Sequence, residues 1–200
     1  TNWLESLLST LIWQPCTSAT IAYEYYKIFS HYAAETGMPP EFVKWQGHDF
    51  SFRGMSSLES SISSSMAHLL PFTGTDTIPA ICALAKYYDA KPGELIGGSI
   101  PATEHSVMCA GGDDNEYETI KRLITEVYPA GPVSIVSDTW NLWRVLTEIL
   151  PRLKAEIMAR PGKVVVRPDS GDPVKIMCGN PEGKSEAERK GVIELLWDAF

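Results

Sequence analysis

The chain has 200 residues, 44% of them hydrophobic, and a formal net charge of −8 at pH 7, so it is long enough and apolar enough to bury a core. The negative charge argues against nucleic acid and anionic membrane surfaces as partners, because their phosphates need broad basic patches. A phosphorylated small molecule is not excluded, since a few arginines and a magnesium ion can bind a phosphate locally.

Two helices are expected at the start of the chain. Apolar residues repeat at helical spacing over residues 3–12, and this pattern stops before Pro15. Thr17 is then expected to cap a second helix that runs to about residue 34. The Gly-Met-Pro-Pro stretch at residues 37–40 breaks the helical pattern.

After this break, short apolar runs alternate with helical patterns. The weak strand candidate is at residues 43–45, and the stronger strands are expected at residues 133–137 and 164–166. Helices are expected near residues 58–70, 77–88, 115–128 and 140–150, with a short helix opened by residues 103–105 and a last one after a polar surface loop at residues 180–190.

The order strand, helix, strand with two largely apolar strands predicts parallel pairing and an α/β architecture, here as part of an irregular (β/α) barrel. The chain begins with Thr1 rather than Met, and its last helical pattern stops at Phe200 without a cap. We therefore expect residues 1–200 to be one partial catalytic barrel domain, with N-terminal and C-terminal portions of the full protein missing.

The cysteines predict a reducing compartment. Cys16, Cys82, Cys109 and Cys178 are far apart and form no C-x-x-C pair, which argues against a disulfide framework and against a zinc site. The sequence contains no N-x-S/T sequon and no apolar run of membrane-spanning length. These features together predict a cytoplasmic protein that binds neither membrane nor nucleic acid.

Charged residues follow the expected strands. Asp138 comes directly after residues 133–137, and Arg167 and Asp169 come directly after residues 164–166. Active sites of α/β barrels lie at the carboxyl ends of the strands. Each residue alone has a simpler explanation, because Asp138 could cap a helix and Asp169 could belong to an ordinary turn. An Arg and an Asp together after a buried strand are costly to place there without a ligand.

Two further segments carry ionisable residues. His105 lies in a segment of small residues, where a histidine could act as an acid or base, a phosphate ligand or a nucleophile, or only as a structural hydrogen-bonding group. Asp76 lies beside an expected helix N-terminus, where spacing alone favours a cap. Phe50 and Arg53 lie in a glycine-flanked loop after residue 45.

Five blocks in this order closely resemble the nicotinamide phosphoribosyltransferase family. They are HDFSFRG at residues 48–54, GTDT at 74–77, SIPATEHS at 99–106, VSD at 136–138 and RPDSG at 167–171. Together with the opening Thr1-Asn2-Trp3, the resemblance covers nearly the whole chain. It implies a phosphoribosyltransferase domain that joins nicotinamide to phosphoribosyl diphosphate in NAD salvage. It also implies Mg²⁺ as cofactor, coupled ATP hydrolysis through a phosphohistidine, and a homodimer with shared active sites.

The resemblance assigns a role to each candidate on the phosphate side. His105 would be the phosphorylated histidine, with Asp138 holding its ring so that one nitrogen stays free as a nucleophile. Arg53 and Arg167 would hold the diphosphate. Asp169 would bind the ribose hydroxyls and, through water, magnesium; none of these residues is expected to ligate a metal directly.

The remaining candidates would bind the base. Phe50 would stack on the pyridine ring, Asp76 would accept a hydrogen bond from the carboxamide nitrogen, and Ser99 would contact substrate. Ser51 and Phe52 replace the family's usual Gly-Tyr. The family's glycine-rich 5′-phosphate loop is expected beyond Phe200, and the second aromatic wall is expected upstream of Thr1 in a partner subunit.

Three alternatives remain open. A nicotinate phosphoribosyltransferase shares the fold and the chemistry, although Asp76 would repel an acidic substrate. Another phosphate-handling barrel such as an aldolase would need a Schiff-base lysine or a metal cluster at the rim. A non-catalytic interaction protein of the same fold would have no reason to keep both Arg53 and His105.

Overall fold

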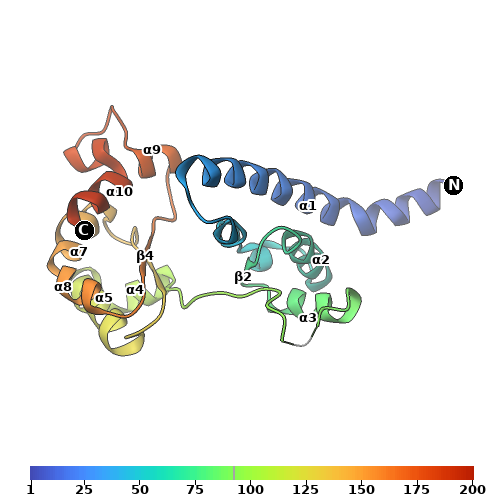
Figure 1. The fold of residues 1–200 in the computed structure, drawn as a ribbon, viewed down its shortest axis with the longest axis horizontal. Coiled ribbons are helices and arrows are strands. Elements are labelled where there is room, and N and C mark those ends of the chain that lie inside the picture. Colours follow the sequence, from blue (N-terminus) through green and yellow to red (C-terminus); the bar gives the residue numbers. More distant parts are fainter. Residues whose placement is uncertain (92) are drawn as a thin grey trace. The chain divides into compact units, whose positions relative to one another are not determined.

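A computed structural model describes residues 1–91 and 93–200, which form two compact units, Thr1–Ser99 and Ile100–Phe200. Each unit combines helices with a small parallel sheet of two strands. Figure 1 shows the ribbon of the chain, coloured from its N-terminus to its C-terminus. The expected α/β class with parallel pairing is confirmed, in a helix-rich form. The barrel and the assignment of residues 1–200 to one domain stay predictions.

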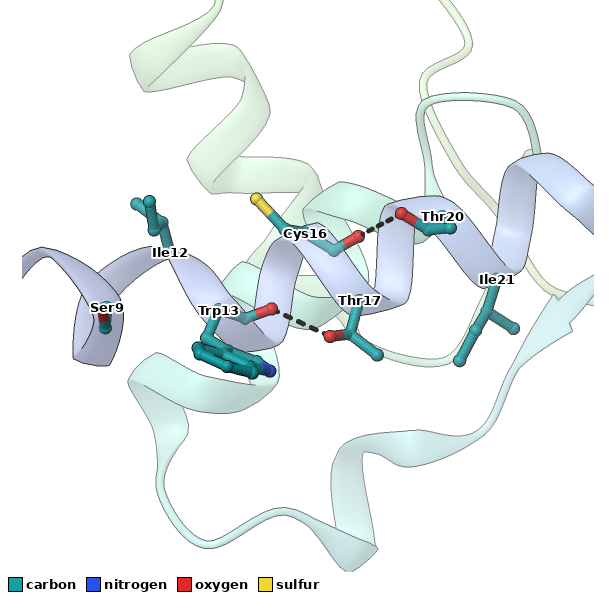
Figure 2. Close-up of a pocket in the computed structure, with 7 residues that line it drawn as sticks. All are labelled: Ser9, Ile12, Trp13, Cys16, Thr17, Thr20 and Ile21. Atoms are coloured by element: carbon teal, nitrogen blue, oxygen red, sulfur yellow. Dashed lines mark hydrogen bonds between the residues drawn. The ribbon is translucent and has the colours of Figure 1, made fainter.

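Unit 1 opens with one continuous helix, α1 (Asn2–Thr36), so the expectation of two helices separated at Pro15 is wrong. Pro15 removes one helical N–H donor, a loss that costs a helix interior about 3 kcal/mol. Thr17 does not cap a helix; its hydroxyl donates to the Trp13 carbonyl at 3.0 Å, beside the proline (Figure 2). α1 contacts α2 and η1, and its buried residues, Ala22 and Ala33, lie after the proline; the helix ends as expected, at a left-handed Gly37.

The strand expected at residues 43–45 is also wrong, because those residues belong to a 3₁₀ helix. The proline at its first position presets a helical φ, and the chain becomes extended only after Gly47. The helices expected near residues 58–70 and 77–88 are confirmed. The elements that follow α1 are η1 (Pro40–Trp45), β1 (His48–Asp49), η2 (Ser51–Gly54), α2 (Leu58–His68), β2 (Gly74–Thr75) and α3 (Ile78–Tyr87).

The sheet of unit 1 joins two loops that are far apart in sequence. β1 pairs with β2 in parallel, with His48 opposite Gly74 and Asp49 opposite Thr75. Gly98 forms a further parallel bridge with Gly74. The end of β1 and the end of β2 therefore lie next to each other.

Unit 2 contains most of the predicted regular structure. The helices expected at residues 115–128 and 140–150 are confirmed, and each continues into a π-helical stretch (η4 and η5). The last helix starts at Glu186, inside the expected loop, because Ser185 and Glu188 form a capping box. The elements are α4 (His105–Gly111), η3 (Asp113–Asn115), α5 (Glu116–Arg122), η4 (Leu123–Val127), β3 (Val133–Val136), α6 (Leu142–Arg144), η5 (Val145–Ile149), α7 (Leu150–Arg152), α8 (Lys154–Ala159), β4 (Val164–Arg167), α9 (Pro173–Cys178) and α10 (Glu186–Ala199).

The core of unit 2 surrounds β3. All four residues of this strand are buried, and β3 pairs with β4 in parallel from Val133–Val164 to Val136–Arg167. The short segment around Ala102 bridges to Ser134 on the other edge of β3. Both expected strands are thus confirmed, and their carboxyl ends meet at one edge.

No helix in the described ranges, 1–91 and 93–200, combines the length and the apolar character that a membrane span requires.

Candidate active site

The predicted phosphate-side residues of unit 2 gather where β3 and β4 end. Arg167 closes β4, and its guanidinium donates from Nη1 to Asp169 Oδ1 at 2.7 Å and from Nη2 to the Thr103 carbonyl at 2.7 Å. The Thr103 hydroxyl in turn accepts from the Val136 backbone N–H at 2.9 Å. The guanidinium is therefore held at the strand ends by fixed partners.

The His105 ring lies at the first position of α4, with hydrogen bonds at both nitrogens. Nδ1 is 3.1 Å from the Thr139 hydroxyl, and Nε2 is 3.2 Å from Asp169 Oδ2. The carboxylate at the ring is thus that of Asp169, whereas the expectation was Asp138. Asp138 instead supports the next turn, where its Oδ2 accepts from the Asp169 N–H at 2.9 Å and from the Ser170 hydroxyl at 2.6 Å.

The hydrogen bonds of Asp138 favour its ionised form. Burial alone would raise the pKa of this carboxyl, but the donors from Ser170 and Asp169, with His105 nearby, bring the pKa below its usual value. Its second oxygen, Oδ1, is buried and has no hydrogen-bond partner. This corner of unit 2 therefore contains a buried carboxylate oxygen whose hydrogen-bonding capacity is not used within the described residues.

The simpler explanations for these acids do not account for their contacts. The helix after β3 is capped by Asn141, whose side chain accepts from the Arg144 N–H at 3.1 Å, so Asp138 is not its cap. The turn after β4 ends at Asp172, which caps α9. Asp138 and Asp169 are thus free of capping roles: Asp138 binds the loop that carries Asp169, and the Asp169 side chain binds Arg167 and His105.

The predicted base-side residues gather in unit 1 around Asp76. Its Oδ1 lies 3.0 Å from His48 Nε2 and accepts from the Ser99 hydroxyl at 2.6 Å. The His48 ring also packs on Phe50, with ring centroids 4.4 Å apart. Arg53 follows in η2 and is exposed. His48, to which the sequence assigned no role, thus connects Asp76 to Phe50, and Ser99 bonds directly to Asp76.

Asp76 does not cap the helix that follows it. Thr77 is the N-cap residue of α3 and makes no side-chain cap bond, and the Asp76 carboxylate is turned to His48 and Ser99 instead. The side chain of Asp76 is 37% exposed. It is therefore an acceptor that a small ligand can reach.

Asp49 is the second residue that sequence reasoning missed. Its carboxylate accepts from the Ser51 N–H at 3.0 Å and from the Thr75 and Thr77 hydroxyls at 3.1 and 2.9 Å. Burial acts to raise the pKa of Asp49, but these donors and the Ser65 hydroxyl outweigh it and lower the pKa to about 2. In the sequence, Asp49 stands out only as a member of the HDFSFRG block at residues 48–54. Its role could not be predicted, because residue spacing does not show which side chains meet.

The close contact between β1 and β2 also depends on Gly74. A Cβ at this position would lie 2.7 Å from His48 Nδ1 and 3.0 Å from the Gly47 carbonyl oxygen. The absence of a side chain at residue 74 therefore leaves room for the imidazole that binds Asp76.

The depressed pKa of Asp49 predicts a pH-dependent contribution to stability. Because the folded pKa of about 2 lies below the reference value of 3.8, the stabilisation is complete above pH 3.8 and is lost as pH falls through 2. Its size is about 2 kcal/mol. The difference in unfolding free energy between the full-length wild type and Asp49→Asn should shrink between pH 6 and pH 3.

The matched control for this measurement is Asp89→Asn, the same change at an exposed residue of unit 1 whose positive φ of 51° suits asparagine. A difference between wild type and Asp49→Asn that stays constant over this pH range would contradict the prediction.

Two cavities of unit 1 differ in their relation to the site. One of about 370 Å³ is lined by His48, Asp49 and Ser51 together with residues of α1 and α2. Another of about 480 Å³ is lined only by residues of α1 and contains none of the predicted site residues (Figure 2). The cavity beside β1 is thus the one that adjoins the base-side cluster.

Across the described part of the chain, no three or more His, Cys, Asp or Glu side chains cluster as a metal site. Magnesium commonly uses one or two carboxylates, with water and substrate phosphates as its other ligands. The unpartnered Oδ1 of Asp138, next to Asp169, meets that smaller requirement.

Comparison with known proteins decides the family. The model of the nicotinate phosphoribosyltransferase (NAPRTase) family matches residues 45–200. The chain belongs to the nicotinate phosphoribosyltransferase family. The family resemblance that five sequence blocks indicated is thereby confirmed.

Relatives within the nicotinate phosphoribosyltransferase family carry a nicotinamide name. A nicotinamide phosphoribosyltransferase of Acinetobacter baylyi is 50% identical over 207 aligned residues, which cover 100% of this chain and 41% of the relative. One of Mycoplasma pneumoniae is 40% identical over 98% of this chain and 40% of the relative. One of Xanthomonas campestris is 36% identical over 88% of this chain and 38% of the relative. The chain thus spans about 40% of the length of these relatives.

Proposed function

We propose that the protein to which this chain belongs transfers the phosphoribosyl group of phosphoribosyl diphosphate to nicotinamide, forming nicotinamide mononucleotide and diphosphate. The observation that carries this proposal is Asp76, an accessible carboxylate held by His48 and Ser99. A carboxylate accepts hydrogen bonds and donates none when ionised, so it suits the N–H donors of an amide. The nicotinamide names of the relatives support the same substrate.

Base binding would use both groups that His48 contacts. The pyridine ring would stack on Phe50, which is 46% exposed, while the carboxamide nitrogen donates to Asp76. The ring nitrogen is then left to attack the anomeric carbon. Orientation of this kind would lower the entropic barrier of a two-substrate reaction.

The arginines would stabilise the negative charge that develops on the leaving group. As the bond from the anomeric carbon to diphosphate breaks, Arg53 and Arg167 would stabilise the growing negative charge. Asp169 would accept hydrogen bonds from the ribose hydroxyls and balance the positive charge on the sugar. Asp169 would bind Mg²⁺ through water, with the unpartnered Asp138 Oδ1 beside it, and the ion would neutralise diphosphate charge when bound.

ATP coupling would pass through His105. The Asp169 carboxylate, 3.2 Å from Nε2, favours the tautomer with its proton on that nitrogen, so that the lone pair on Nδ1 accepts from the Thr139 hydroxyl at 3.1 Å. That hydroxyl would turn away as the lone pair attacks the γ-phosphorus of ATP, and ADP would leave. The exposed, unpaired cysteines support a cytoplasmic setting for this reaction.

The direct test uses the full-length protein with nicotinamide, phosphoribosyl diphosphate, Mg²⁺ and ATP. We expect stoichiometric nicotinamide mononucleotide and diphosphate, measured by chromatography and a coupled diphosphate assay. Failure to convert nicotinamide, while nicotinate is converted, would replace this proposal by its nearest alternative.

That alternative, a nicotinate phosphoribosyltransferase, is favoured by one specific contact. His48 lies 3.0 Å from Asp76, and a protonated imidazole there would offset the repulsion between Asp76 and a substrate carboxylate. Parallel assays with the two bases distinguish the two functions.

We also propose that the full-length enzyme is a homodimer with shared active sites. One face of Phe50 packs on His48, and the ring is otherwise exposed enough to accept a base and a second aromatic wall from a partner. Sedimentation velocity of the full-length protein should show a dimer. An active monomer would contradict this prediction.

A further inference from the structure

Asp49 connects the two loops that carry the base-side residues of unit 1. One carboxylate oxygen accepts from the Ser51 N–H, directly after Phe50, and the other accepts from the Thr75 and Thr77 hydroxyls, on either side of Asp76. The Asp49 carbonyl also accepts from the Asp76 N–H at 3.0 Å. Both the side chain and the backbone of Asp49 therefore determine where Asp76 lies.

The backbone pairing between these loops is too short to fix them alone. β1 and β2 share only two residue pairs, and isolated strand pairs much longer than this are at best marginally stable. The side chains that reach Asp49 come from residues with no exposed surface, since Thr75 and Thr77 are both 0% exposed. Thr75 is itself hydrogen-bonded to Ser65 of α2 at 3.0 Å. This buried network anchors both loops to the body of unit 1.

We propose that Asp49 is a positioning residue for base selection, which fixes Asp76 relative to Phe50 through Ser51, Thr75 and Thr77. The proposal rests on the function proposed above and deepens it. Asp49 is 8% exposed and both its oxygens are occupied, so it acts without touching the base. A displacement of about 1 Å at a substrate-orienting group can change a rate a hundredfold.

The chemistry of the network predicts a graded series of variants. In Asp49→Asn the amide oxygen can still accept from the Ser51 N–H, but the amide N–H₂ then faces two hydroxyls that must turn to accept. In Asp49→Ala all three donors lose their acceptor. The loss of base recognition should therefore increase from wild type through Asn to Ala.

The experiment measures steady-state kinetics of the full-length enzyme with nicotinamide and nicotinate. For Asp49→Ala we expect the KM for nicotinamide to rise about tenfold or more, with the KM for phosphoribosyl diphosphate within about twofold of wild type. The ratio of kcat/KM for nicotinamide over nicotinate should fall about tenfold, and Asp49→Asn should lie between. Thr77→Val, which removes one hydroxyl, should change the same parameters in the same direction.

Thr73→Val is the matched control, because Thr73 is also buried but lies outside the Asp49 network. Thermal unfolding verifies that each variant is folded, and if Asp49→Ala is not, Asp49→Asn and Thr77→Val decide. A lower unfolding temperature with unchanged base KM and unchanged selectivity would overturn the proposal and leave Asp49 a structural residue. A wild type that converts neither base would instead refute the proposed function, and this inference with it.

Discussion

The His105→Ala variant of the full-length protein is expected to lose all acid-labile labelling from γ-labelled ATP and to keep only slow, uncoupled phosphoribosyl transfer. A phosphohistidine requires a ring nitrogen, which alanine lacks. Removing a group that transfers protons or forms a covalent intermediate typically slows a reaction by about 10² to 10⁴. The measurement combines filter-bound label with the ratio of ADP to nicotinamide mononucleotide formed.

His31→Ala provides the control for this experiment, because His31 lies on the exposed surface of α1 beside Glu35. It should label and turn over as the wild type does. Asp169→Asn should lower the labelling without abolishing it, since the amide still contacts Nε2 but no longer stabilises a charged ring. Equal labelling of wild type and His105→Ala would rule out His105 as the phosphorylated residue.

The Asp76→Asn variant is expected to lose most of the preference for nicotinamide over nicotinate. Nicotinamide offers two N–H donors to Asp76, whereas the carboxylate of nicotinate would meet a like charge. Because the Asp76 side chain is 37% exposed, water screens part of this repulsion. We therefore expect a net discrimination of about 3 kcal/mol, which corresponds to roughly a hundredfold preference. In the variant, kcat/KM for nicotinamide should fall and that for nicotinate should rise.

The readout is the ratio of kcat/KM for the two bases, compared with that of Asp89→Asn. Asp89 is exposed in the same unit and lies outside the cluster around Asp76, so its replacement should leave the ratio unchanged. A ratio that is the same in Asp76→Asn as in wild type would show that Asp76 does not select the base and contributes only to local stability.

The regular parts of the fold were predictable because their patterns are local. The runs at Val133–Val136 and from Val164 onward are rich in valine and isoleucine, which favour strands, and both runs form strands. These two strands pair in parallel, as largely apolar strands separated by a helix are expected to do. The helix break predicted at Pro15 is wrong, because the rule for proline assigns only a local cost, and a single helix continues through this residue.

The candidate site was predictable as two sets of residues but not as a network. Motif resemblance selected Asp76 and Asp138, and the structure shows that neither caps a helix. The resemblance could not show that Asp169 rather than Asp138 contacts the His105 ring, nor that Asp49 joins two loops. These contacts depend on strand register and on the direction of each side chain, which one sequence does not contain.

The glycine at position 74 has a consequence for how this protein tolerates mutation. Since even a methyl group there would lie 2.7 Å from the His48 ring, alanine would force the imidazole to turn away from both Asp76 and Phe50. Position 74, where the residue has no side chain and no chemistry of its own, is therefore as restricted in the amino acids that it accepts as a position with a chemical role. In a saturation mutagenesis library selected for function, every substitution at position 74, including alanine, should be depleted. Substitutions at positions on the exposed face of α1 should be tolerated in the same library.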